Sequence, residues 1–311
     1  MKIVQIGTGG WGKNHSRVLS EFGVLSAICD TNPKLAEELG KKYSVNFYDS
    51  IENLLEREEF DAALVCTPTS THTEIASRLI ENKKHVFVEK PLTYLSEDGQ
   101  KLIETAKKNN IILTCGYIER FNPAVATVKD FLKSKKYGDL IRLEFYREHR
   151  MPQHIKDVGI IYDTSVHDID TALWLFDEVP DVVFAIAGSI NHEHEDFATI
   201  MLGFKDNKNA TISSNWITPT RVRNFNAVCT DARIFSNFIT QEIRIETNNG
   251  TENPKNEKTE PLSLEIRNFI DAIQGKNDLI VKPEQAVNVT KIAEAALLSS
   301  QKGTPIYLDL R

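Results

Sequence analysis

The first residues that could do chemistry are three glycines in the stretch IGTGGWGKNH, near the start of the chain. Gly7, Gly9 and Gly12 fit the pattern G-x-G-x-x-G between an apolar run and a helical pattern. Backbone amides and the helix dipole can bind a pyrophosphate there without interference from side chains. The alternative is a glycine turn that only packs a helix on a sheet.

Asp30 ends the next apolar run. A carboxylate at this position can accept hydrogen bonds from the ribose hydroxyls of a dinucleotide and would repel a 2'-phosphate, so the sequence predicts NAD rather than NADP. The expected cofactor contacts in this part of the chain are Gly7, Gly9, Gly10, Trp11, Gly12 and Asp30.

A polar loop, CTPTSTH, follows another predicted strand. Ligands of open α/β folds bind at the carboxyl edge of the parallel sheet, so Thr67, Pro68 and His72 are expected to contact the cofactor. A compatible alternative is a capping loop in which Ser70 or Thr71 starts the next helix.

The stretch HVFVEKPLTY places an acid and a base directly after a buried strand pattern. Glu89 and Lys90 would therefore lie at the same edge of the sheet, with Glu89 toward the nicotinamide ribose. A lysine in a partly desolvated cleft can bond a substrate hydroxyl and stabilise the developing alkoxide, which predicts a catalytic role for Lys90. The alternative is a solvated ion pair, which is what most neighbouring Glu and Lys residues form.

The stretch GIIYDTSVHDID contains an acid and a histidine at a helical spacing of four. Asp163 and His167 can share one face of a helix start, and Asp168 and Asp170 are close by. Histidine has the pKa range of a base that removes a hydroxyl proton, and a neighbouring carboxylate can fix its tautomer. The alternatives are helix-capping carboxylates and a structural histidine.

Two lesser clusters carry weaker signals. NHEHED contains His192 and His194 without a distant third ligand, so a solvated strand end is expected and no metal. A basic cluster in an otherwise acidic protein could bind a diphosphate or carboxylate, or could be a solvated loop. Its members are Arg147, His149, Arg150, His154 and Lys156.

Alternating strand and helix patterns carry the first three motifs. Strands are predicted at Lys2–Ile6, Leu25–Cys29, Ala62–Cys66, His85–Val88 and Ile111–Cys115. Helices are predicted at Lys34–Tyr43, Thr73–Asn82 and Glu97–Asn109. Apolar strands without alternation, joined by helices, predict a doubly wound parallel sheet of the Rossmann type.

After Gly116 the pattern changes to strands of period two, which predicts an α+β domain with a largely antiparallel sheet, open on one face. Strands are expected at Ile141–Tyr146, Phe197–Phe204, Ala210–Asn215, Arg223–Cys229 and Ile243–Ile245, and a loop at Thr247–Pro261. Helices are expected at about Pro123–Ser134, Ser165–Phe176, Leu264–Gln274 and Glu284–Ser300. The predicted domains are residues 1–118 and 119–311.

Length and composition limit the class of protein. A chain of 311 residues suits two domains, and a net charge of -7 argues against a nucleic-acid or membrane partner. No stretch approaches the roughly 18 apolar residues of a membrane-spanning helix, and the opening strand pattern leaves no room for a signal peptide. The four scattered cysteines are expected to be reduced thiols of a cytoplasmic protein.

The four motifs, in this order, resemble the glucose-fructose oxidoreductase and inositol dehydrogenase family, Gfo/Idh/MocA, over essentially the whole chain. The resemblance implies a Rossmann domain that binds NAD and a C-terminal α/β domain whose open sheet usually makes dimer or tetramer contacts. It also implies catalytic roles for Lys90, Asp163 and His167, and a cis bond between Lys90 and Pro91.

Within the family, GYIERFNP, EDFATI and NWITP are most similar to the branch that oxidises carbon 3 of UDP-N-acetylglucosamine or its uronic acid. The branch implies a nucleotide-sugar substrate and a downstream aminotransferase acting on a 3-keto sugar. Two departures are CTDARIFSNFITQ, which lacks a small glycine turn, and His154, where an arginine is usual. The expected substrate contacts are Arg120, Asn122, Arg150, Asp163 and Trp216, with Tyr117 at the cofactor and Arg221 and Arg223 in or beside the site.

Three other functions remain open at this point. The first is a dehydrogenase of a free polyol or aldose. The second is an NAD-binding regulator without turnover, which would usually lack the lysine or the histidine. The third is an NAD-dependent glycosidase that uses a transient oxidation.

Overall fold

The computed structural model describes residues 1–152 and 155–310, which form two compact units. The first unit is Met1–Tyr117 together with Leu262–Val287. The second is Ile118–Pro261 together with the residues from Asn288 onward. The chain first passes from one unit to the other after Tyr117, beside the predicted domain boundary. The prediction assigned all later residues to the second domain and so missed the return of the chain to the first unit.

Leu262–Val287, which we call the return segment, completes the core of the first unit. The ring of Phe269 packs edge-on against Phe87, with ring centroids 5.8 Å apart. The hydroxyl of Thr114 donates a hydrogen bond of 2.8 Å to the carbonyl of Val281. These contacts join residues far apart in sequence, which local patterns do not reveal.

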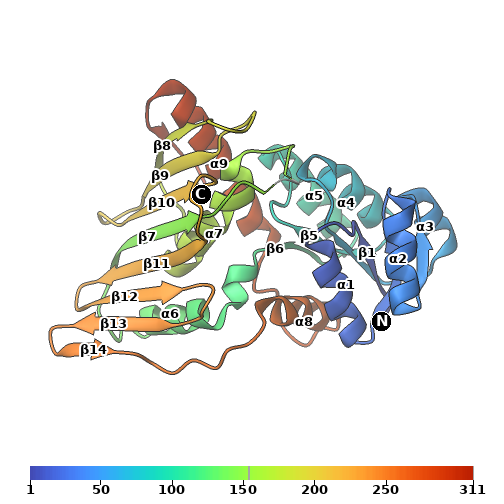
Figure 1. Cartoon of the computed structure of the whole chain (residues 1–311), viewed down its shortest axis with the longest axis horizontal. Helices are drawn as coiled ribbons and strands as arrows, with labels where there is room; N and C mark the ends of the chain where they lie inside the picture. Colours follow the sequence, from blue (N-terminus) through green and yellow to red (C-terminus); the bar gives the residue numbers. More distant parts are fainter. Residues whose placement is uncertain (153–154, 311) are drawn as a thin grey trace. The chain divides into compact units, whose positions relative to one another are not determined.

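The first unit contains one sheet of six parallel strands in the order β3-β2-β1-β4-β5-β6 (Figure 1). All residues of β1 and β4 are buried, as apolar runs without alternation predict. The order reverses between β1 and β4, where open α/β sheets bind ligands. The predicted Rossmann sheet is confirmed. Its strands are β1 (Ile3–Ile6), β2 (Leu25–Cys29), β3 (Asn46–Tyr48), β4 (Ala62–Val65), β5 (His85–Glu89) and β6 (Leu113–Gly116).

Helices connect these strands. Side chains of Asn32 and Ser50 cap α2 and α3 by accepting hydrogen bonds from the amides of Lys34 and Asn53. The sequence patterns did not predict α3 or β3. The helices are α1 (Gly12–Glu21), α2 (Pro33–Tyr43), α3 (Ile51–Arg57), α4 (His72–Glu81), α5 (Ser96–Lys108) and α8 (Pro261–Ile273), with a 3-10 turn η1 (Thr69–Thr71) before α4.

The second unit contains a sheet of nine strands in the order β14-β13-β12-β11-β7-β10-β9-β8-β15 (Figure 1). Only β7 and β10 run parallel, so the predicted, largely antiparallel sheet is confirmed. The patterns missed β8, β12, β14 and β15. The strands are β7 (Leu140–Glu148), β8 (Val182–Gly188), β9 (Phe197–Gly203), β10 (Asn209–Asn215), β11 (Val222–Cys229), β12 (Ala232–Asn237), β13 (Ile243–Thr247), β14 (Gly250–Glu252) and β15 (Ile306–Tyr307).

Helices cover one face of this sheet. In the described part of the chain, α6 packs against β12, and α7 packs against β7 and β10. A π-helical turn, η3, leads directly into α7, at the position predicted for a single helix start. No helix among residues 1–152 and 155–310 is long and apolar enough to cross a membrane. The elements are η2 (Ile118–Phe121), α6 (Pro123–Lys133), η3 (Ile161–Ser165), α7 (Val166–Phe176) and α9 (Pro283–Lys302).

Candidate active site

The glycine loop of the first unit has the backbone geometry of a pyrophosphate site. Gly7 has φ of +81°, and a Cβ atom on it would lie 2.4 Å from the carbonyl oxygen of Cys66. A Cβ on Gly12, the first residue of α1, would lie 2.1 Å from the carbonyl oxygen of Gly7. Open space surrounds Gly9 and Gly10, so the loop backbone is accessible at the start of α1, next to the exposed Trp11.

Asp30 is held at the end of β2 in an orientation that suits a ribose. The amide and hydroxyl of Thr8 donate hydrogen bonds of 2.7 and 2.6 Å to Oδ2 of Asp30. The amide of Asn32 donates to Oδ1. A carboxylate oxygen can accept more than one hydrogen bond, so Asp30 retains acceptor capacity for ribose hydroxyls. The glycine loop and Asp30 therefore fit NAD.

The loop after β4 contains Thr67, Pro68 and His72, the predicted cofactor contacts. Pro68 is exposed and Thr67 is half-buried, and the hydroxyl of Thr67 accepts a hydrogen bond of 2.7 Å from Thr71. The prediction for His72 needs correction: the ring is buried, with Nδ1 2.8 Å from the carbonyl oxygen of Pro91 and Nε2 2.9 Å from that of Thr67. Both ring nitrogens face backbone carbonyls, so His72 joins two loops of the sheet edge.

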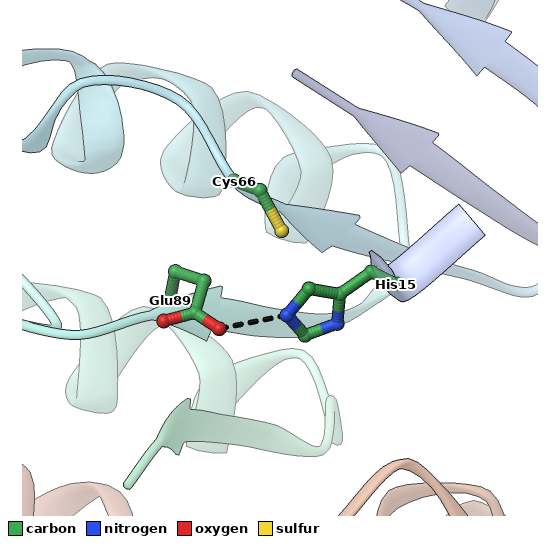
Figure 2. A group of neighbouring side chains, drawn as sticks. All are labelled: His15, Cys66 and Glu89. Atoms are coloured by element: carbon green, nitrogen blue, oxygen red, sulfur yellow. Dashed lines mark hydrogen bonds and ion pairs between the residues drawn. The ribbon is translucent and has the colours of Figure 1, made fainter. Parts of the chain in front are cut away.

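The predicted cis bond between Lys90 and Pro91 is present, and Lys90 is half-buried directly after β5. Glu89 is buried and does not have the predicted orientation toward a ribose. Its Oε1 lies 2.7 Å from Nε2 of His15, on α1, as Figure 2 shows, and its Oε2 accepts a hydrogen bond of 3.1 Å from the amide of Lys90. Glu89 thus links the glycine-loop helix to the lysine turn.

The surroundings of Glu89 set its charge. Burial alone would raise the pKa of Glu89, but the hydrogen bond to His15 and the charges of His15 and Lys90 lower the pKa below its ordinary value. The carboxylate is therefore ionised at neutral pH. It opposes the ionisation of the nearby thiol: burial and the Glu89 charge raise the pKa of Cys66 well above its ordinary value.

His15, Cys66 and Glu89 lie close together, with ligand atoms within 4.8 Å of one another (Figure 2). The 2.7 Å separation of His15 Nε2 and Glu89 Oε1 is a hydrogen-bond distance. Two ligands that each lie about 2.0–2.2 Å from one tetrahedral zinc ion would be farther apart. We therefore interpret the group as a buried hydrogen-bonded pair of His15 and Glu89 beside a protonated thiol.

Tyr117, another predicted cofactor contact, follows β6 and is buried, with its amide bonded to the carbonyl of Cys115. Lys90 belongs to the first unit, whereas Asp163 and His167 belong to the second.

In the second unit, the segment from Val158 to Phe176 is buried except at three residues. Asp163, His167 and Trp174 are half-buried, so Asp163 and His167 are the ionisable side chains of this segment that solvent or substrate can reach. Asp163 lies in the π-helical turn, a feature frequent at functional sites. The predicted pair therefore shares an accessible part of one helix.

Neighbouring side chains fix Asp163 and the helix start. The hydroxyl of Thr164 donates a hydrogen bond of 2.9 Å to Oδ2 of Asp163. It accepts one of 3.1 Å from the indole nitrogen of Trp216. Ser165 bonds the hydroxyl of Ser214 at 3.0 Å. Trp216, predicted as a substrate contact, is buried and instead supports Thr164.

Two buried ion pairs anchor the rest of α7. Arg147 donates to both oxygens of Asp168 and to Glu119, at distances of 2.8 to 3.1 Å. Arg120 pairs with Asp170 at 2.6 Å. Burial raises the pKa of both aspartates, although the arginines oppose the shift. Arg147 is therefore buried, which corrects the prediction of a single accessible basic cluster.

The other predicted substrate contacts separate into structural and exposed residues. Arg120 is buried against Asp170, and this corrects its expected role. Asn122 is also buried: its side chain caps α6 at the amide of Ala124 and donates to the carbonyl of Phe238. Arg150 is exposed. His154 lies outside the described residues.

The NHEHED segment lies in the loop between β8 and β9, where His194 is exposed and His192 half-buried, and two of its acids also make structural contacts. Asp196 is fully buried and accepts hydrogen bonds from the amides of Ile190 and Asn191. Glu195 accepts one from the amide of Ile161, at the π-helical turn. The loop therefore supports the helix that carries Asp163.

Three residues of the site had no sequence signal. Thr8 lies at a variable position of the glycine motif, His15 lies three residues after the motif, and Thr164 lies between the two catalytic candidates. Their roles depend on partners distant in sequence, or on a turn geometry that the spacing does not specify. Only the fold identifies them.

Known proteins resemble the chain over most of its length. An oxidoreductase family model for an NAD-binding Rossmann fold, Gfo/Idh/MocA, matches residues 1–117, and the model of its C-terminal alpha/beta domain matches residues 150–308. A UDP-N-acetylglucosamine 3-dehydrogenase of Acidithiobacillus ferrooxidans is 26% identical over 88% of each chain. A myo-inositol 2-dehydrogenase of Thermotoga maritima is 32% identical over 66% of this chain and 65% of that protein.

Solved structures share the fold. The structure of the Acidithiobacillus ferrooxidans UDP-N-acetylglucosamine 3-dehydrogenase has a TM-score of 0.88 at 24% identity, covering 97% of this chain and 98% of that one. An oxidoreductase from Agrobacterium radiobacter in complex with NAD+, L-tartaric acid and magnesium has a TM-score of 0.90 at 18% identity, covering 99% and 98%. Since both domain models match, the chain belongs to the Gfo/Idh/MocA oxidoreductase family and binds NAD.

Proposed function

We propose that this oxidoreductase oxidises a secondary hydroxyl of a sugar, and that its substrate is a UDP-sugar oxidised at carbon 3, with UDP-N-acetylglucosamine as the first candidate. The observation that carries the proposal is that Asp163 and His167 are accessible within a segment, Val158–Phe176, that is otherwise almost entirely buried. The similarity to a UDP-N-acetylglucosamine 3-dehydrogenase over 88% of both chains supports the choice of substrate.

In the proposed reaction, His167 takes the proton of the substrate hydroxyl. Asp163, held by Thr164, orients the imidazole and stabilises its positive charge. Lys90 hydrogen-bonds the same substrate oxygen and stabilises the negative charge that develops on it. When bound, NAD accepts the hydride from the carbon atom. The product is a 3-keto sugar.

His167 and Lys90 are both candidates for the formal base, and replacement of each would separate them. We expect His167→Ala to lower kcat by about 10²–10⁴-fold and to remove the corresponding limb of the pH–rate profile. His194→Ala, at an exposed histidine of the same unit, is the matched control. A near-normal rate and pH profile in His167→Ala would show that another group is the base.

A dehydrogenase of a free polyol is the second candidate. The similarity to a myo-inositol 2-dehydrogenase, which is 32% identical over about two thirds of the chain, favours it. An NADH-formation screen would compare UDP-N-acetylglucosamine, its uronic acid, other UDP-sugars, myo-inositol and glucose. NADH with polyols and none with UDP-sugars would replace the proposed substrate. Release of a free sugar would indicate a glycosidase, and tight NAD binding without any turnover a regulator.

We also propose that the chain forms a homodimer or homotetramer through the uncovered face of the nine-stranded sheet. Large apolar side chains of that sheet are exposed, among them Ile186 at 60%, Met201 at 51% and Tyr146 at 40%. Burial of such side chains between two copies would remove apolar area from water. The cytoplasm is the proposed location, and an aminotransferase acting on the keto product the proposed downstream partner.

A further inference from the structure

The helix-covered face of the second sheet changes from apolar to cationic along β7. Cross-strand partners share a face, so the register gives rows of side chains. One row is Ile212, Phe145 and Phe225, and the next is Ser214, Arg147 and Arg223. The next row on the same face lies two residues further along each strand. It contains Trp216 after β10, His149 after β7 and Arg221 before β11. The cationic rows are those beside the π-helical turn, because Ser165 bonds Ser214 and Trp216 bonds Thr164.

Arg147 and Arg223 are neighbours of like charge, but only Arg147 has acidic partners that bind it directly. Arg147 bonds Asp168 and Glu119. The Nε atom of Arg223 is buried and has no hydrogen-bond partner among residues 1–152 and 155–310. Burial, with Arg147 and Arg221 nearby, lowers the pKa of Arg223 to about 10. A buried donor without an acceptor is costly, so Nε of Arg223 is a position at which a ligand oxygen would be stabilised, and the positive charges of the arginines favour an anionic one.

Besides Arg147 and Arg221, the carboxylates Glu119 and Asp168 are within electrostatic range of Arg223, and its row of side chains lies beside the turn that carries Asp163. Burial lowers the pKa of His149, Arg223 and Arg221 lower it further, and Asp163 raises it. His149 is therefore within electrostatic range of both arginines and of Asp163. Arg221 is exposed, so the arginine pair extends from a buried donor to an accessible guanidinium.

We propose that Arg221 and Arg223 form a subsite for an anionic group of the substrate, a carboxylate or a phosphate, bound beside Asp163. Guanidinium groups bind both anions through paired, charge-assisted hydrogen bonds. The inference rests on the proposed function and extends it, because a carboxylate or phosphate can pair with two guanidinium groups, and a neutral polyol has neither group. The anion comes either from a uronic acid carboxylate on the sugar or from the diphosphate of the nucleotide.

The test is calorimetric titration of the NAD-loaded full chain with UDP, UDP-N-acetylglucosamine and its uronic acid. Arg223→Gln removes the charge and keeps a polar side chain, and Arg223→Lys is the conservative variant. We expect Arg223→Gln to raise Kd by about 10- to 100-fold, and Arg223→Lys to recover part of the affinity. Arg233→Gln, on β12 with a side chain 52% exposed, is the matched control and should bind like the unmodified chain.

The ligands distinguish the two sources of the anion. Equal weakening for all three ligands supports a phosphate subsite, and weakening confined to the uronic acid supports a carboxylate subsite. Unchanged Kd values for all three in Arg223→Gln, or no binding of any of them by the unmodified chain, would overturn the inference. NADH formation is measured separately, so tight, arginine-dependent binding without turnover would contradict the proposed function and leave the subsite standing.

Thermal unfolding distinguishes a ligand subsite from a structural role. Because Arg223→Gln removes a buried charge that lacks a direct partner, its unfolding temperature without ligand should equal or exceed that of the unmodified chain. A lowered unfolding temperature together with equal loss of affinity for every ligand, including NAD, would assign Arg223 to the fold and overturn the subsite.

Discussion

Several buried ionisable side chains in this protein have a partner side chain within the same unit. Arg120 and Arg147 each pair with a buried aspartate, and Glu89 has a hydrogen bond with His15 and the charge of Lys90 nearby. Removal of one partner from such a pair leaves an uncompensated charge, which costs more than loss of a surface ion pair. The buried pairs hold the site together. Lys90, Asp163 and His167 are half-buried, so a substrate can reach them.

Glu89→Gln tests the link between α1 and the lysine turn. The amide of the variant side chain can still bond His15, but the negative charge beside Lys90 is lost. We expect the free energy of unfolding to fall by about 1–3 kcal/mol and kcat to fall on the order of 10²-fold, because the Lys90 turn shifts. Urea unfolding and steady-state kinetics measure the two effects.

Glu21→Gln is the control for Glu89→Gln, because Glu21 forms an exposed pair with Arg17 on the same helix. It should leave both quantities nearly unchanged. A Glu89→Gln enzyme with normal kcat would mean that the lysine turn keeps its position without this carboxylate.

His72 predicts a pH dependence of stability. Burial lowers the pKa of His72 in the folded chain from its ordinary value of 6.5, even though hydrogen bonds to two carbonyls oppose the shift. Below pH 6.5 the unfolded chain therefore binds more protons at this residue than the folded chain, so stability falls as pH drops toward the folded pKa. Urea unfolding between about pH 5 and 7.5 measures how the free energy of unfolding changes with pH. This change should be smaller in His72→Gln than in the control His194→Gln. Equal slopes would contradict the assignment.

At the scale of elements, two glycines of the loop before α1 have different roles: one is needed for the fold and the other for cofactor binding. A methyl group on Gly12 would meet the backbone of Gly7, whereas one on Gly9 would meet open space. We expect Gly12→Ala to destabilise the first unit by about 2 kcal/mol or more, and Gly9→Ala to unfold normally but bind NAD more weakly. Thermal unfolding with and without NAD measures both. Normal NAD affinity in Gly9→Ala would place the pyrophosphate elsewhere.

The elements that the sequence predicted are those with a clear period. β2 was predicted at both ends, and α2 to within one residue. β3 has three residues, too few for a pattern. β8 was missed because apolar residues point to both of its faces. Phe184 and Ile186 on the outward face are apolar like the inward residues, so the alternation of polar and apolar residues is absent.

The site was predictable where chemistry depends on local spacing. Lys90 and the Asp163–His167 pair follow from residue type and position, and the cis bond before Pro91 from the resemblance. The burial of Arg120 depends on Asp170, which lies 50 residues away along the chain. No local pattern tells a buried, paired arginine from one that binds a ligand.

At the scale of the whole molecule, the uncovered sheet face predicts self-association. Met201→Asp would place a charge among the apolar side chains of that face, at a residue 51% exposed, and should shift the chain to monomers. Ile239→Asp, in a turn with a side chain 49% exposed, is the control and should leave the assembly unchanged. Light scattering measures the mass. A monomeric unmodified chain would contradict the proposed interface.

The return segment determines when the first unit can be completed during synthesis. Phe87 and Thr114 emerge from the ribosome early, but their partners Phe269 and Val281 emerge only after nearly the whole second sheet has been made. The usual order, in which an N-terminal domain finishes first, cannot apply here. Strands β5 and β6 must therefore wait, with part of their apolar surface uncovered, until the return segment has been made.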